Sequence, residues 1–420
     1  MRVQQRIDGM IGSALTMAAS RLAGRLTEMR RQLHQDPELG HQEVRTTARV
    51  RAWLENTSIV RFPLVSPTGL VGDLIGQSDG PVVALRADLD GLPVEEGNTA
   101  AAAAGYRSRE AGRMHACGHD FHTAALVGAA LLLDDMRDRL HGRVRLIFQP
   151  GEEGGTGALA MIREGVLAAP AVDMIFALHS FPGLEAGQVG VSGGPLMAAA
   201  DAFDITVRGE GGHAGLPHWT RDPIVAAAAI ISALQTIVSR KTDPFSTAVV
   251  TLGVVQGGTD RNVIPGEVTL AGTIRSFDAG IRARLHQQID HLVLSVADGY
   301  GVQASVSIRP EGGPVVNDDS AAAIVRDAAR AVLGAECVVP AEPVMAGEDF
   351  AYYLEHVPGC MFWLGTASRD DRFTRRPWHH PAYDTDESAL PAAAAVLAET
   401  ALRALEHLRE GSPARAQDPH

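Results

Sequence analysis

Cysteine and lysine are scarce in this chain of 420 residues, and each scarcity excludes a class of protein or mechanism. Three cysteines (Cys117, Cys337 and Cys360) are too few for a disulfide-built scaffold, so the fold must rest on a hydrophobic core. Lys241 is the only lysine, so a Schiff-base mechanism would have to use that one residue. A formal net charge of -13 argues against a nucleic-acid binder, which would carry a basic patch.

Long uninterrupted hydrophobic runs are also lacking. The apolar stretch near the N-terminus is broken by Asp8 and runs on into Arg21 and Arg25, which predicts an amphipathic helix rather than a signal peptide. The most apolar helix candidate, residues 223–239, carries Ser232, Gln235 and Thr236 and has the length of a buried helix. We therefore expect a cytoplasmic protein that does not span a membrane.

The N-terminal half alternates short apolar runs with helical stretches. Residues 82–85, 144–148 and 174–178 have the pattern of buried strands, and residues 124–133 and 157–167 suit helices between them. Strand–helix–strand alternation predicts an α/β domain with a mainly parallel sheet covered by helices. The alanine run at 99–104 is expected to lie in a loop.

The middle of the chain has a different pattern, with the order β-α-β-β-α-β that is typical of a ferredoxin-like α+β domain. The expected elements are 202–207, 222–239, 247–255, 268–274, 278–299 and 302–308. We therefore predict an inserted domain at residues 195–310. Residues 1–194 and 311–420 would form a discontinuous larger domain.

The segment from Met114 to His122 concentrates potential metal ligands. It contains three histidines and Cys117, and thiolate and imidazole suit zinc and related first-row metals. In an extended segment Cys117 and His119 would point the same way. A polar loop around a buried cysteine is the alternative for any one of these residues, but it explains the whole cluster poorly.

Ionisable side chains also follow three separate predicted strands. Asp88 and Asp90 follow the first, Glu152 and Glu153 follow the second within a glycine-rich turn, and His179 follows the third. Ligands of open parallel sheets bind at the carboxyl ends of strands, so these groups should converge. One glutamate could then bind metal while the other acts as a base. A solvated carboxylate pair and a core histidine are the alternatives.

Three further motifs are weaker. The adjacent His379 and His380 could complete a metal shell from a distance. The glycines at 209–212 lack the spacing of a phosphate loop and more plausibly let His213 project from a strand end. Ser192 lies in a G-x-S-x-G pattern, but neighbouring glycines and a proline oppose the strand and helix that a nucleophile elbow requires.

Taken together, these segments resemble the M20 family of metallopeptidases and amidohydrolases, in the branch of hippurate hydrolase, N-acyl-amino-acid amidohydrolases and indoleacetyl-amino-acid hydrolases. The resemblance runs over nearly the whole chain. It is carried by 31–40 (RQLHQDPELG), 86–93 (RADLDGLP), the 115–122 cluster, the glutamate pair and 347–350 (GEDF).

The resemblance implies a catalytic domain with two divalent ions per subunit (zinc, manganese, cobalt or nickel) and a lid domain that also forms a homodimer or higher homo-oligomer. The metal ligands that it implies are Cys117, His119, Glu153, His179 and His379. Glu152 matches the general base, and Asp88 the acid that orients a ligating imidazole. His213 matches a lid histidine that stabilises the oxyanion of a partner's site. Asn262 and Arg275 match positions that hold the substrate carboxylate.

The expected reaction is metal-dependent hydrolysis of an N-acyl amino acid, with an acetyl, benzoyl or other aryl-acyl group, to a carboxylic acid and a free amino acid. A dipeptidase, a carboxypeptidase or an N-acetyl-diaminopimelate deacetylase of the same family is the alternative. A non-catalytic metal-bound binding protein is disfavoured, because Glu152 and every implied ligand are present. Phe121 stands where the family usually has glycine, which is expected to alter the pocket. The choice of His379 over His380 rests on the spacing to Pro381.

Overall fold

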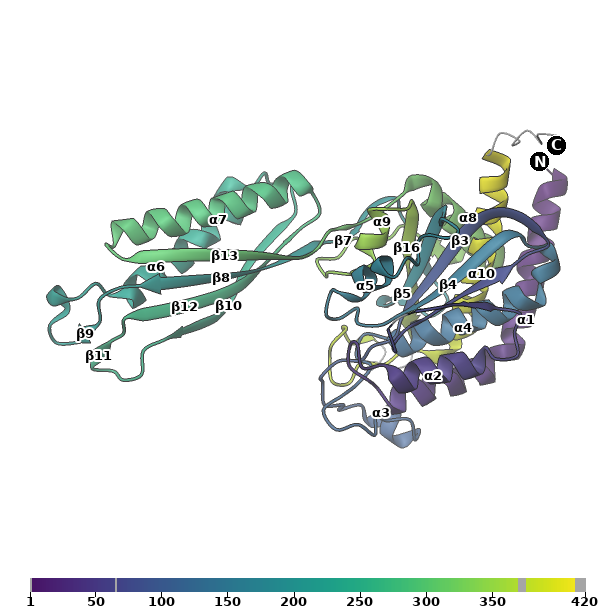
Figure 1. Ribbon diagram of the computed structural model, residues 1–420, viewed down its shortest axis with the longest axis horizontal. Coiled ribbons are helices and arrows are strands. Elements are labelled where there is room, and N and C mark those ends of the chain that lie inside the picture. The colour runs from purple at the N-terminus through teal and green to yellow at the C-terminus, as the bar shows by residue number, and fades with distance from the viewer. Residues whose placement is uncertain (1, 65, 369–374, 412–420) are drawn as a thin grey trace. The chain divides into compact units, whose positions relative to one another are not determined.

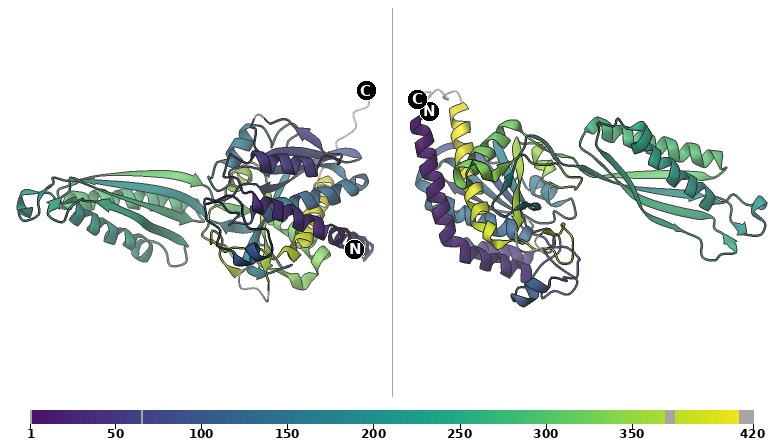
Figure 2. Two further views of the ribbon diagram at one scale, coloured as in Figure 1. Left: turned by 90° about the horizontal axis from the view of Figure 1, so that it is seen from below. Right: turned by 180° about the vertical axis from the view of Figure 1, so that it is seen from behind.

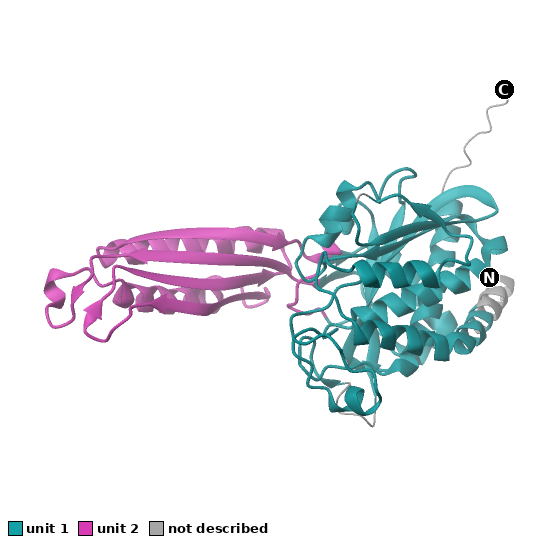
Figure 3. Cartoon of the chain, turned by 60° about the horizontal axis from the view of Figure 1, so that its bottom comes forward, with its two compact units in different colours: residues 1–196, 316–342, 352–420 teal, residues 197–315, 343–351 magenta. Residues whose placement is uncertain are grey.

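The computed structural model describes residues 2–64, 66–368 and 375–411, with the backbone alone described at 2–11 and 13. These residues form two compact units (Figure 3). The first unit takes in the described residues within 1–196, 316–342 and 352–420, and the second comprises 197–315 and 343–351. The insertion predicted at 195–310 thus lies almost wholly within the second unit. Segment 343–351, assigned from sequence to the larger domain, clusters with the second unit.

The first unit is built on an eight-stranded mixed sheet in the order β1-β2-β4-β3-β5-β16-β6-β15. Its central strands β4, β3, β5 and β16 are labelled in Figure 1. The strands β4, β3, β5 and β16 at its centre are parallel to one another. The bounds are β1 Val60–Phe62, β2 Leu70–Ile75, β3 Ser78–Asp88, β4 His141–Gln149, β5 Met174–Glu185, β6 Val189–Gly190, β15 Val338–Val339 and β16 Gly359–Ala367. The expected α/β fold with a mainly parallel centre is confirmed.

Helices pack on this sheet because its central strands are buried along most of their length. The helices α4, α8 and α10 contact its strands, and α1 packs on these three helices; α1 and α10 lie side by side (Figure 2). The bounds are α1 Arg2–Gln35, α2 Val44–Trp53, α3 Thr99–Ala103, α4 His119–Asp135, α5 Gly157–Arg163, α8 Asp319–Leu333, α9 Ala351–Leu354 and α10 Leu390–Gly411. Short 3-10 turns lie at Arg137–Arg139, Ala335–Cys337 and Glu387–Ala389.

The alanine run is a short helix, α3, and not the loop that we expected. The side chain of Asn98 accepts hydrogen bonds from the backbone N–H groups of Ala100 and Ala101, at 3.0 and 3.1 Å. This N-cap satisfies donors that a helix start otherwise leaves unpaired, and alanine has the highest helix propensity. The sequence therefore carried a helix signal in Asn98.

The second unit has the predicted β-α-β-β-α-β order. Its antiparallel sheet runs β10-β12-β8-β13, and both α6 and α7 pack on the strands. The bounds are β8 Ala199–Arg208, α6 Pro223–Thr236, β10 Ala248–Gly257, β12 Glu267–Ser276, α7 Ala279–Gly299 and β13 Gln303–Gly312, with β9 Gly212–His213 and β11 Val263–Ile264 as a small extra pair. A 3-10 turn lies at Pro217–Trp219, and a π-helical segment at Ile237–Lys241 follows α6. The short strands β7 Gly194–Met197 and β14 Val315–Asn317 pair with each other.

Among the described residues, two helical segments are long and apolar enough to cross a membrane by length and composition alone, Pro223–Lys241 and Glu387–Gly411. The second is 72% buried within the structure and belongs to the core of the first unit. The first is 33% buried and packs one face on the four-stranded sheet. One segment therefore packs in a hydrophobic core and the other packs one face on a sheet, so length and composition alone are weak evidence for a membrane span.

Candidate metal centre and active site

The carboxyl ends of the central strands carry the side chains that the sequence analysis selected. Asp88 ends β3, Glu152 and Glu153 follow β4 after a short turn, and His179 lies on β5. All of these strands are parallel to one another, so their carboxyl ends meet at one edge of the sheet. The helix α4 begins at the same edge with His119, which brings the predicted histidine–cysteine segment to this place.

Cys117 and His119 are brought together by a turn, and not by the extended segment that we expected. Gly118 is the N-cap residue of α4 and has a left-handed backbone, with φ 88° and ψ 16°. Only glycine adopts this conformation without a steric penalty. A Cβ atom at Gly118 would lie 2.3 Å from Oγ of Ser180, so the close approach also requires glycine.

Five side chains place their donor atoms around a common region. The Sγ atom of Cys117 lies 3.7 Å from Nε2 of His179, and Nε2 of His119 lies 3.8 Å from Oε1 of Glu153. The Nε2 atom of His379 lies 3.5 Å from Oε2 of Glu153. Ligand atoms that sit 2.0–2.3 Å from one tetrahedral ion are roughly 3.3–3.8 Å apart, so these separations suit metal binding.

Two of these donor atoms have no hydrogen-bond partner among the described residues. Nε2 of His119 and Oε1 of Glu153 are both buried and form no hydrogen bond there. Buried polar atoms without a partner are rare and call for an explanation. A cation between them would satisfy both, and thiolate, imidazole and carboxylate are the donor set that first-row divalent metals take. The residues therefore fit a metal site.

The electrostatics of the cluster also favour a cation. Burial by itself would lower the pKa of His119, but the carboxylates of Asp88 and Asp90 raise it to about 10. Burial would raise the pKa of Asp88, but His119, His122 and Arg86 hold it well below its usual range. The carboxylates thus create a negative potential at the edge of the sheet, which attracts positive charge.

The tautomer of His179 leaves one nitrogen facing the cluster. Its Nδ1 lies 2.9 Å from the carbonyl oxygen of Ser180, and a carbonyl only accepts, so Nδ1 carries the proton. Burial and the neighbouring His122 lower the pKa of His179 well below its usual range, so the ring is neutral at neutral pH. The lone pair of Nε2 then points toward Cys117, which is the arrangement of a ligating imidazole.

The structure separates the two adjacent histidines of the C-terminal loop. His379 has φ 63° and reaches Glu153, whereas Nε2 of His380 lies 3.1 Å from the guanidinium of Arg376. Nδ1 of His380 also accepts the backbone N–H of Ala382, at 2.9 Å. Of the two, His379 is therefore the one that lies at the cluster.

Asp90 has a position that the sequence analysis noticed without giving it a role. Its Oδ1 accepts the backbone N–H of Glu152 at 3.1 Å, and its Oδ2 that of Glu153 at 3.0 Å. The same Oδ1 lies 3.2 Å from Nδ1 of His119. Asp88, which was expected to orient a ligating imidazole, makes its shortest histidine contact with His122, at 2.7 Å, and lies 3.8 Å from Nε2 of His119.

Phe121 packs in the interior of the first unit. It is fully buried and belongs to the main hydrophobic core with the other residues of α4. A different set of rings surrounds His179. Phe181 stacks on Trp363 with ring centroids 5.0 Å apart, and Trp378 lies 4.8 Å from His179 and 5.6 Å from Phe181. This ring cluster (Phe181, Trp363 and Trp378) packs beside the candidate metal ligands, with Trp363 fully buried and Phe181 and Trp378 partly exposed.

Three of the expected site residues belong to the second unit and are described within it. His213 lies on β9 and is exposed, and the carbonyl of Asn262 accepts the backbone N–H of Ala214 at 2.9 Å. Arg275 lies on β12 and donates to the carbonyl of Ile274 at 3.0 Å. The structure thus brings His213 and Asn262 to neighbouring segments. Their roles stay predictions.

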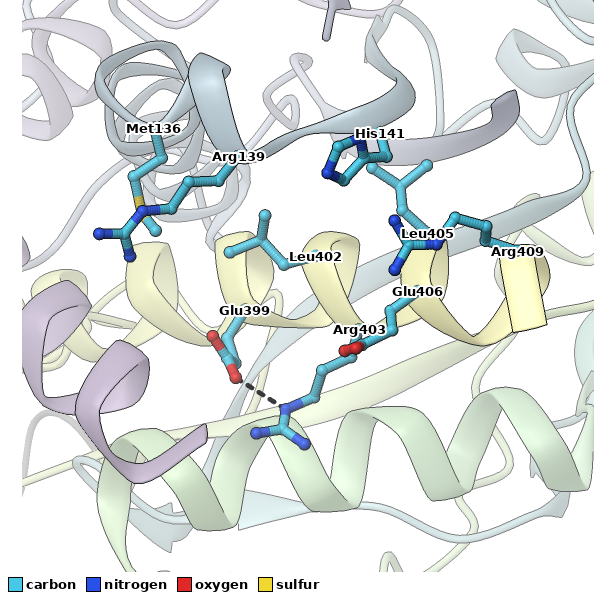
Figure 4. Close-up of a pocket in the computed structure, with 9 residues that line it drawn as sticks. All are labelled: Met136, Arg139, His141, Glu399, Leu402, Arg403, Leu405, Glu406 and Arg409. Carbon is cyan, nitrogen blue, oxygen red and sulfur yellow. Dashed lines mark hydrogen bonds and ion pairs between the residues drawn. The ribbon is translucent and has the colours of Figure 1, made fainter. Parts of the chain in front are cut away.

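The first unit also has a pocket outside this cluster, between the C-terminal half of α10 and the start of β4 (Figure 4). Leu402 and Leu405 contribute apolar surface, and one ion pair of the pocket joins Arg403 to Glu399. Because β4 begins at His141, the pocket adjoins the amino ends of the parallel strands. The candidate metal centre lies at their carboxyl ends.

Known proteins are similar in sequence to this chain over nearly its full length. The chain is 43% identical to an N-acetyl-L-cysteine deacetylase of Bacillus subtilis, covering 93% of this chain and 91% of that protein. It is 39% identical to the IAA-amino acid hydrolase ILR1-like 2 of Arabidopsis thaliana, covering 91% and 85%.

The fold matches solved structures as well. The Bacillus subtilis YXEP protein, a dinuclear metal-binding peptidase from the M20 family, matches with a TM-score of 0.80 at 40% identity, covering 92% of this chain and 99% of that one. The model of the peptidase family M20/M25/M40 matches residues 84–403. The resemblance seen in the motifs is therefore confirmed, and the chain belongs to the peptidase family M20/M25/M40.

Proposed function

We propose that the protein is a metal-dependent amidohydrolase that cleaves N-acyl amino acids into a carboxylic acid and a free amino acid. The observation that carries this proposal is the position of Glu152. It is a mostly buried carboxylate whose Oε2 lies 3.9 Å from Nε2 of His119, beside the metal-type donor set. The relatives named for N-acetylcysteine deacetylation and IAA-amino acid hydrolysis support the same substrate class.

The metal ligands in this proposal are Cys117, His119, Glu153, His179 and His379. Two divalent ions held there would acidify a water molecule and polarise the scissile carbonyl. The soft thiolate of Cys117 favours zinc, whereas the carboxylates also suit manganese.

The residues around the ligands hold and move the protons. Glu152 takes a proton from the attacking water and gives it to the leaving amine nitrogen, the task of a general base that then acts as an acid. Asp90 fixes the turn that presents the carboxylate, because it accepts the backbone N–H groups of both Glu152 and Glu153. The same turn therefore presents Glu153 as a proposed ligand and Glu152 as the proposed base.

The finer assignments concern the second unit and the assembly. We propose that His213 stabilises the oxyanion in a partner subunit's site, and that Asn262 and Arg275 bind the carboxylate of the substrate. This arrangement requires a homodimer or higher oligomer formed through the second unit. We also propose that the protein is cytoplasmic. A monomeric mass in solution together with full activity would reject it.

The central test is Glu152→Gln, which keeps the size of the side chain but cannot accept a proton. We expect the variant to bind two metal ions per chain and to lose about 10²- to 10⁴-fold in kcat. The exposed Glu55→Gln is the matched control and should retain activity. Turnover near that of the wild type in Glu152→Gln would reject the assignment of the base.

A substrate panel separates this function from its alternatives. N-acetyl and N-benzoyl amino acids, hippurate among them, should be hydrolysed faster than dipeptides and N-acetyl-diaminopimelate, with zinc, manganese or cobalt added. Faster hydrolysis of dipeptides would favour the peptidase alternative. Metal binding without hydrolysis of any member of the panel would favour a binding protein.

A further inference from the structure

A buried chain of hydrogen bonds runs beneath the candidate metal ligands. Oδ1 of Asp88 lies 2.7 Å from Nδ1 of His122, and Nε2 of His122 accepts the backbone N–H of Ser180 at 2.8 Å. Oγ of Ser180 lies 3.0 Å from the hydroxyl of Tyr383. None of these four residues is more than 1% exposed, so water cannot replace the bonds at low cost. We call this set the buried chain.

The buried chain fixes the protonation of His122. A backbone N–H can only donate, so Nε2 of His122 must be the acceptor and the ring proton must lie on Nδ1. That proton is donated to Asp88. Both ring nitrogens are therefore occupied. Although donor atoms of Asp88, His119 and His122 lie within 4.8 Å of one another, this group is not a third ion-binding site in this arrangement.

Three of the four members of the buried chain, His122, Ser180 and Tyr383, adjoin a segment that carries a proposed metal ligand. His122 lies one helical turn after His119 in α4, and Ser180 directly follows His179 on β5. Tyr383 closes the loop that carries His379. These segments are far apart in sequence, so the buried chain is a direct polar link between them.

The same chain also reaches the Cys117 segment. Oγ of Ser180 lies 3.3 Å from the carbonyl oxygen of Cys117 and 3.0 Å from Nε2 of His122, and either atom can accept its proton. The backbone of Gly118 passes so close that a Cβ there would lie 2.3 Å from Oγ of Ser180 and 3.1 Å from the hydroxyl of Tyr383. Ser180 thus contacts the backbone of one proposed ligand and directly follows another.

We propose that His122 and Ser180 are positioning residues that hold the segments of Cys117, His119, His179 and His379 in their metal-binding arrangement before any ion is bound. Groups that orient metal ligands from behind typically change metal affinity or activity 10- to 100-fold when removed. A preorganised set of ligands binds an ion without the cost of ordering three separate segments. The inference rests on the ligand set of the proposed function.

Two substitutions of His122 test its bond to Asp88 and its bond to Ser180 separately. In His122→Asn the amide nitrogen takes the place of Nδ1, so the bond to Asp88 is kept and the bond to Ser180 is lost. In His122→Gln the amide oxygen takes the place of Nε2 and can still accept the N–H of Ser180. His115→Asn is the matched control, because His115 is equally buried in the same segment and its ring forms no hydrogen bond with the described residues.

The measurement is the dissociation constant of zinc for the full-length metal-free protein, obtained by competition with a chelator, alongside thermal unfolding of the metal-free form and kcat at saturating zinc. We expect His122→Asn to weaken zinc binding on the order of 10- to 100-fold. His122→Gln should recover most of that loss, and His115→Asn should leave zinc affinity within a fewfold of the wild type.

Equal zinc affinity in the wild type and His122→Asn would overturn the inference, even if the variant unfolds at a lower temperature, because the residue would then serve stability alone. Equal losses in His122→Asn and His115→Asn would overturn it too. Neither result would contradict the proposed function. That proposal is tested separately, and it fails if Glu152→Gln retains turnover.

Discussion

Gly118→Ala tests whether the turn between Cys117 and His119 depends on close approach as well as on backbone freedom. A left-handed alanine costs about 1–2 kcal/mol. The new Cβ would also lie 2.3 Å from Oγ of Ser180, far inside ordinary contact, and overpacking of this kind costs about 1–3 kcal/mol. The free energy of unfolding should therefore fall by about 2–5 kcal/mol.

Gly165→Ala provides the matched control. Gly165 has φ 84°, close to the 88° of Gly118, but nothing lies within 4 Å of the position of its Cβ. The free energy of unfolding of Gly165→Ala should fall only by the cost of the left-handed backbone, about 1–2 kcal/mol. Urea unfolding of the metal-free variants, followed by tryptophan fluorescence, gives both values. An equal fall in the free energy of unfolding in the two variants would show that the side chain of Ser180 moves aside without cost. This result would refute the argument from close approach.

Three further outcomes follow from the site. Phe181→Leu should lower kcat/KM for N-benzoylglycine more than for N-acetylglycine, by about 2- to 10-fold, because ring contacts contribute about 0.5–1.5 kcal/mol. An equal fall in kcat/KM for the two substrates would exclude a role for the ring cluster in acyl selection. Iodoacetamide should inactivate the metal-free enzyme at Cys117 and bound zinc should slow this, which peptide mapping checks. Burial lowers the pKa of His34, but hydrogen bonds to Asp120 and Glu96 raise it to about 9. The stability that this proton contributes, about 3 kcal/mol, is complete below pH 6.5 and should be lost as the pH rises through about 9, seen as a falling urea midpoint.

The general position of the site could be predicted because strand order and chemistry agree in the sequence. Asp88, Glu152 and His179 each follow an apolar run, and parallel strands place such residues at one edge. Both fold classes were predictable for a related reason, since hydrophobic periodicity marks strands and helices along the chain.

Contacts that depend on backbone geometry could not be predicted. The role of Asp90 rests on backbone N–H groups of Glu152 and Glu153, which leave no mark in the residue types. The position of Phe121 depends on the rotational phase of α4, which turns it into the core. The ring cluster joins residues 181, 363 and 378, whose proximity follows from the pairing of β5 with β16 and from the path of a loop.

The left-handed backbone of His379 has a consequence for the rate of metal exchange. A non-glycine residue stays at φ 63° only if its surroundings hold it, and here the backbone N–H of His379 donates to the carbonyl of Ala116 at 2.8 Å. Ala116 immediately precedes Cys117, so the loop and the cysteine segment are tied to each other. Neither of these two proposed ligands can then move away without straining the other. We therefore expect slow, concerted release of the ions, with a half-life set by the opening of this loop rather than by the strength of any single coordinate bond.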